Sequence, residues 1–97
     1  MVVSMQAEVF ITQTEGGFVE ISVVKSGLSS GAAHKYETVE KAKAVLLAFG
    51  FDSALVDRQL RSVLETPPHA LLRLPVAEIP DDVLTSLGFT AAAFTAA

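Results

Sequence analysis

The residues that could do chemistry gather in one run of small and basic side chains at 25–35, which reads KSGLSSGAAHK. The backbone N–H groups of a glycine-rich loop that faces a helix start can hold an anion, and basic side chains add positive charge. One hypothesis for this run is therefore a site for an anion or another small ligand. Its contacts would be Lys25, Ser29, Ser30, His34 and Lys35.

The spacing of the glycines in this run is not that of a phosphate loop. Gly27 and Gly31 are separated by three residues, and no Lys-Ser or Lys-Thr step follows them, although nucleotide-binding phosphate loops require one. The competing interpretation is a plain connection built of small residues. We favour the connection and keep the ligand site as the alternative.

Nucleophilic catalysis has little support in the same run. Ser29 or Ser30 could be grouped with His34, but no strained turn surrounds either serine, and the sequence identifies no oxyanion donors. We therefore predict that the protein is not an enzyme.

A metal site would have to be assembled from distant segments. It would need His34 and His69 together with a carboxylate from Glu78, Asp81 or Asp82, and the chain has no pair of histidines at helical spacing. The acidic pair at 81–82 is better explained as the first turn of a helix, where negative charge is favourable. We predict neither a metal nor a cofactor.

Composition limits the partners. The chain has 97 residues, 51% of them hydrophobic, with 11 acids against 7 bases and no cysteine. A net charge of −4 disfavours nucleic acid as a partner. A DNA-binding regulator that uses Arg58, Arg61 and Arg73 is the third hypothesis. The mean hydropathy of +0.47 is high for a small domain, which indicates either a large core or apolar surface buried against a partner, most simply a second copy.

Targeting signals are not evident. Residues 1–6 have no basic stretch, and no apolar run approaches the length that crosses a membrane. We expect a cytoplasmic protein without a membrane span.

Two alternating stretches, 3–11 and 19–23, predict a β-hairpin. A three-residue loop at 15–17, with Gly17 in the left-handed conformation, pairs Ile11 with Ile21 and keeps the apolar residues on one face. Phe10 then faces away from the main core. The run 70–76 predicts a third strand with Leu72 and Leu74 inward, and Pro75 makes it an edge strand or ends it.

Helices are predicted over 39–49, over 53–65 and over 81–87. Thr38 and Asp52 would cap the first two, and Leu64 is placed on the buried stripe of the second. A Gly-Phe pair follows the first helix at 50–51 and the last at 88–89. Glycine there takes the left-handed conformation that ends a helix, and the phenylalanine folds back onto the last turn.

These elements predict a single α+β domain over 1–97, in the order β-β-α-α-β-α, with helices on one face of a small antiparallel sheet of about three strands. The segment 90–97 either adds a last helical turn or frays. So thin a sheet commonly needs further cover. We therefore expect a non-catalytic domain that self-associates, as a homodimer, or binds another protein. The interface candidates are Phe10, Leu28 and Phe94.

Overall fold

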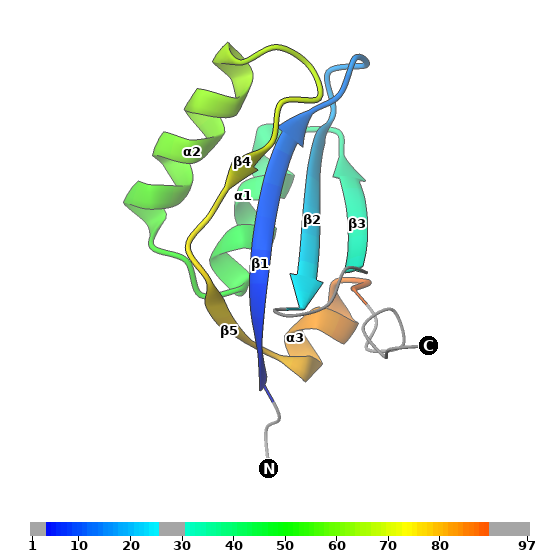
Figure 1. Cartoon of the computed structure of the whole chain (residues 1–97), viewed down its shortest axis with the longest axis vertical. Coiled ribbons are helices and arrows are strands. Elements are labelled where there is room, and N and C mark those ends of the chain that lie inside the picture. Colours follow the sequence, from blue (N-terminus) through cyan, green and yellow to red (C-terminus); the bar gives the residue numbers. More distant parts are fainter. Residues whose placement is uncertain (1–3, 26–30, 90–97) are drawn as a thin grey trace.

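The computed structural model describes residues 4–25 and 31–89 and confirms an α+β architecture with an antiparallel sheet (Figure 1). In chain order the elements are β1 (Ser4–Gln13), β2 (Val19–Lys25), β3 (Gly31–Tyr36), α1 (Val39–Ala48), α2 (Ser53–Glu65), β4 (Leu72–Arg73), β5 (Ala77–Pro80) and α3 (Asp81–Ser86). The sheet has five strands, so the expectation of about three was too low.

The sheet follows the order β3-β2-β1-β4, and β5 pairs with another part of β1. Strand β4 pairs with Phe10 and Ile11, whereas β5 pairs with residues 4–7. The predicted third strand was therefore only partly right. It is two residues long and ends before Pro75, and pairing resumes at Ala77, because proline has no N–H to donate to the ladder.

Strand β3 is the main correction to the sequence analysis. The sequence predicts a loop over 26–35, yet residues 31–36 pair with β2 from Val24↔Gly31 to Val19↔Tyr36. Glycine, alanine and lysine are poor strand formers, so local sequence gave no signal. The backbone groups of β2 that point away from β1 need partners, and β3 supplies them.

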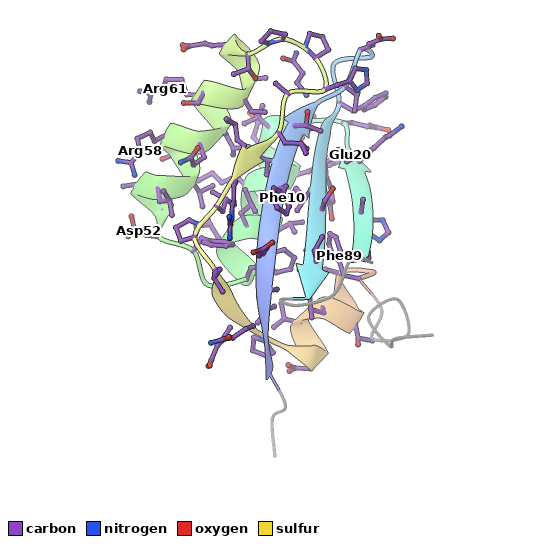
Figure 2. The ribbon with its side chains drawn as sticks, viewed as in Figure 1. Phe10, Glu20, Asp52, Arg58, Arg61 and Phe89 are labelled. Atoms are coloured by element: carbon purple, nitrogen blue, oxygen red, sulfur yellow. The ribbon has the colours of Figure 1, made fainter. Side chains whose placement is uncertain are left out.

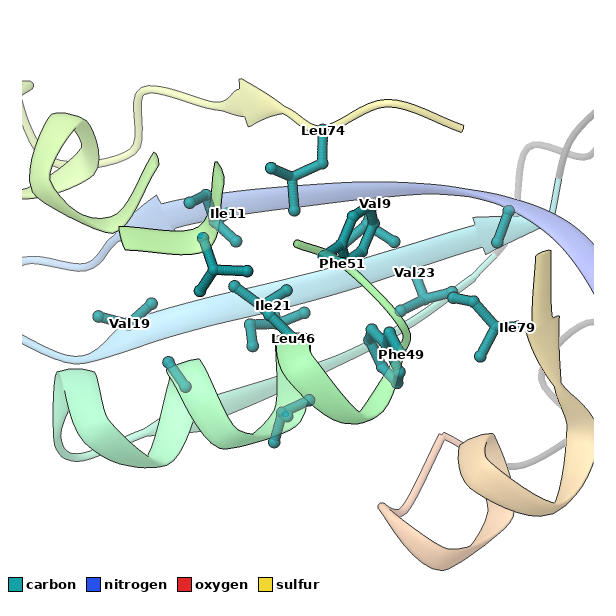
Figure 3. Close-up of a cluster of buried hydrophobic side chains, with 14 of the residues drawn as sticks. Val9, Ile11, Val19, Ile21, Val23, Leu46, Phe49, Phe51, Leu74 and Ile79 are labelled. Carbon is teal, nitrogen blue, oxygen red and sulfur yellow. The ribbon is translucent and has the colours of Figure 1, made fainter. Parts of the chain in front are cut away.

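The hairpin register is as predicted. Ile11 pairs with Ile21, the N–H of Thr14 donates to the carbonyl of Phe18 at 2.9 Å, and Gly17 has a φ of 84°. The shared register places the apolar residues of both strands on one face. Figure 3 shows these side chains against the helical layer.

One core joins that face to the helices. α1 crosses behind the sheet in Figure 1, and both α1 and α2 contribute to the same buried cluster as β1 and β2. Thr38 accepts a hydrogen bond from the N–H of Lys41 at 3.2 Å, and Asp52 accepts from Ala54 and Leu55. The predicted caps are thus confirmed. Leu64 was placed wrongly, because 46% of it is exposed.

Both Gly-Phe corners end their helices in the same way. After α1, the N–H of Gly50 donates to Leu47 at 3.0 Å and that of Phe51 donates to Leu46 at 3.3 Å. After α3, Gly88 and Phe89 make the equivalent bonds. The glycines have φ values of 101° and 90°. This is the Schellman arrangement, which the sequence predicted.

The two corners also pack on each other. The rings of Phe49 and Phe89 meet edge to face, with 5.4 Å between their centroids. Phe89 is fully buried, and its other side contacts the ring of His34 in β3. The end of α3 is thereby attached to both the helical layer and the sheet.

The corners differ in the room they leave for a side chain, which gives a test by substitution. A Cβ at Gly50 would meet nothing within 4 Å, whereas one at Gly88 would lie 3.2 Å from the His34 ring. We expect Gly50→Ala to lower the free energy of unfolding by about 1 kcal/mol, the cost of the left-handed conformation. Gly88→Ala should cost more, as measured by urea denaturation.

The control is His34→Ala combined with Gly88→Ala. If the additional loss comes from the imidazole, the step from glycine to alanine at position 88 should shrink in the His34→Ala background to the value at Gly50. Equal losses for the two single glycine variants would contradict this account of the corner.

Candidate functional site

Of the ligand contacts predicted at 25–35, the structure describes the side chains of His34 and Lys35 only. Ser29 and Ser30 lie outside the described residues, and Lys25 ends β2 opposite Ala7, with its side chain outside the description. His34 and Lys35 are successive residues of β3. Successive side chains of a strand point to opposite faces of the sheet, so these two do not converge on one ligand.

His34 lies on the helical face and has a structural partner. It pairs with the buried Ile21, and its Nε2 is 2.7 Å from the carbonyl oxygen of Gly88, to which the ring N–H donates. Its ring meets that of Phe89 edge to face at a centroid distance of 4.7 Å. These contacts fasten β3 to the corner after α3, a role that a lone histidine in the sequence does not reveal.

The described residues do not bring together a set of metal ligands. Within 4–25 and 31–89 no group of three or more histidine, aspartate or glutamate side chains could hold a metal ion. His69 instead has its Nε2 at 3.5 Å from a carboxylate oxygen of the exposed Glu15. The same ranges contain no helix with the length and apolar character needed to cross a membrane.

The face of the sheet opposite the core carries Phe10, as predicted. Phe10 is half-buried in the middle of β1, where Ser22 and Arg73 flank it on the neighbouring strands (Figure 2). Ser22 in turn pairs with the exposed Ala33 of β3. Leu28 and Phe94, the other predicted interface residues, lie outside the described residues.

Charges of both signs surround Phe10. Arg73 donates from Nη2 to Oε1 of Glu8 at 2.7 Å, and Glu20 pairs in register with Lys35. Two acids therefore match two bases on this part of the face, although the whole chain has a charge of −4. Arg73 is engaged by a carboxylate, which weakens its use as a phosphate contact in the DNA-binding hypothesis.

The two edges of the sheet differ in the length of their strands and in their prolines. One edge consists of the short strands β4 and β5, separated by Pro75 and closed by Pro80. The other edge is β3, six consecutive residues without proline. Proteins blunt sheet edges with short strands and prolines because an uninterrupted edge invites another strand. By that measure the β4–β5 edge is protected, whereas among residues 4–25 and 31–89 no strand pairs with the outer side of β3, so this edge is open within the described part of the chain.

Two buried hydroxyl groups, on Thr12 and Tyr36, have no hydrogen-bond partner among the described residues. Burial raises the pKa of Tyr36 above its ordinary value of 10.0 because the phenolate would lose hydration. A higher pKa in the folded state means that the unfolded chain releases this proton first as the pH rises. The contribution of Tyr36 to stability is therefore complete below pH 10 and is lost above it.

The tyrosine gives a pH prediction that one spectrum can follow, because Tyr36 is the only tyrosine and the chain has no tryptophan. We expect phenolate absorbance to appear above pH 10 in the folded protein and at the ordinary pH in urea. The free energy of unfolding should fall between pH 10 and the folded pKa, and Tyr36→Phe should flatten that fall. An unchanged slope in Tyr36→Phe would show that another group is responsible.

Comparison with known proteins assigns no family to the chain: no family model, no curated protein and no solved structure matches it. Any function proposed for this chain therefore rests on the geometry of its sheet.

Proposed function

We propose that this chain is a non-catalytic domain that works by binding protein through its sheet. The first partner we propose is a second copy of the same chain. The observation that carries the proposal is the contrast between the two sheet edges. Strand β3 presents six residues without a proline, whereas β4 and β5 are short and interrupted. Backbone groups at an open edge recruit another strand without any special side-chain chemistry.

The face around Phe10 supports the same proposal. Phe10 and Ser22 are half-buried although they lie on the two central strands, and Glu8 and Glu20 beside them are each matched by a base, Arg73 and Lys35. Acids that are matched by bases around Phe10 reduce the repulsion that a charge of −4 would otherwise cause when another protein approaches. Two copies joined at their edges would present two such faces side by side.

The alternatives have weaker geometric support. The ligand hypothesis includes His34 and Lys35 among its contacts, but as successive residues of β3 they face opposite sides of the sheet. The ring N–H of His34 already donates to the carbonyl of Gly88. The DNA-binding hypothesis keeps Arg58 and Arg61 on α2, while Arg73 is paired with Glu8. No contact among the described residues adds support to either hypothesis.

Sedimentation velocity between 1 and 100 μM tests the proposal. We expect a dimer that dissociates on dilution. Ala33→Pro should produce a monomer, because the proline would remove a donor from the edge, and Ala33→Ser should remain dimeric. Sedimentation of the Phe10→Ser variant tests separately whether the sheet face around Phe10 contributes to the dimer. A wild-type monomer throughout this range would contradict self-association.

A further inference from the structure

We infer that the second copy binds along β3 in antiparallel orientation, with the two-fold axis at Ala33, so that two sheets become one continuous sheet. This inference rests on the proposed self-association and adds to it a strand, an orientation and a register. It is derived from the hydrogen-bond pattern of the sheet, starting at β1 and moving outward.

The direction of the backbone groups in β1 is fixed by its contact with the segment after β4. The N–H of Leu74 donates to the carbonyl of Val9 at 2.8 Å, so the backbone of Val9 points toward β4. In an antiparallel ladder, alternate residues point to opposite neighbours. The backbone N–H and C=O groups of Phe10 therefore point toward β2, where Ser22 is its partner.

The same alternation carries across β2 to the open edge. Because the backbone groups of Ser22 point toward β1, those of the preceding residue, Ile21, point toward β3, where Ile21 pairs with His34. The N–H and C=O groups of His34 are thus used within the sheet. Those of its neighbours Ala33 and Lys35 point outward, away from β2.

Gly31 lies two residues before Ala33, as Lys35 lies two residues after it, so the backbone N–H and C=O groups of all three residues point outward from β3. They are symmetric about Ala33. An antiparallel copy centred there places Ala33 opposite Ala33 and each Gly31 opposite Lys35 of the other copy, which uses every outward group of the strand. Centring on His34 or on Ala32 leaves some of them without a partner.

Side chains favour this register as well. It keeps the two Lys35 ammonium groups apart and sets each beside a glycine of the other copy. Gly31 pairs with Val24, which is half-buried on the same face of β2. The aliphatic stem of Lys35 from the second copy can cross the glycine and cover Val24 while its charge stays in water.

In this register Ala33 of one copy lies directly opposite Ala33 of the other. Charged substitutions at this one position of the full chain therefore test the register. Directly opposed residues of a strand pair lie about 5 Å apart, so Ala33→Glu should weaken the homodimer at least tenfold, and Ala33→Lys should do the same. An equimolar mixture of the two variants should form a heterodimer. Mass photometry or sedimentation with one labelled copy measures all three samples.

Ser22→Glu is the matched control. Ser22 pairs with Ala33 on the same face but one strand inward, so in the inferred dimer the two copies of position 22 are separated by three strand spacings, about 14 Å. We expect this variant to dimerise like the wild type. Circular dichroism of every variant confirms that each is folded, as the exposure of Ala33 leads us to expect.

The outcomes separate this inference from the proposed function. A wild-type dimer that Ala33→Glu and Ala33→Lys leave intact would keep the function and overturn the register. Loss of the dimer in Ser22→Glu alone would overturn it in favour of contact through the Phe10 face. A monomeric wild type would remove the proposed function, and the inference with it.

Discussion

The edge-to-face contact between Phe49 and Phe89 is the interaction on which the arrangement of this small domain depends. It joins the corner after α1 to the corner after α3, two places that are far apart in the sequence. Each corner needs its left-handed glycine to bring a phenylalanine back onto the last helical turn. The steric requirement of a helix end thus determines how the helical layer meets the sheet.

The same contact also reaches the edge of the sheet. Phe89 packs on His34, and the carbonyl of Gly88 receives the hydrogen bond from that imidazole. Strand β3 would otherwise be held mainly by its backbone pairing to β2. Held from the helical side as well, the edge loses little conformational freedom when another strand binds, and such preorganisation improves affinity.

Much of the fold could be predicted because its signals are local. Alternation with Gly17 in the loop gives the hairpin register, Thr38 and Asp52 give the helix starts, and Gly50 gives a helix end. Each of these depends on a few neighbouring residues. Leu64 shows the limit, since a helical period does not say how wide the buried stripe is.

Strand β3 could not be predicted because its own residues do not favour a strand. Its pairing follows from β2, which has backbone groups to satisfy on both sides. The same pairing directs His34 and Lys35 to opposite faces of the sheet, which the sequence alone did not indicate. Phe10 was placed correctly since its position needs only the hairpin register.

Amide hydrogen exchange across residues 31–36, followed by NMR at several protein concentrations, tests the central claim most directly. At low concentration the amides of Ala32, His34 and Tyr36 should be protected, and those of Ala33 and Lys35 should exchange rapidly. Raising the concentration should protect Ala33 and Lys35 as well, in step with dimer formation. Rapid exchange of both amides in a sample shown to be dimeric would contradict pairing along β3.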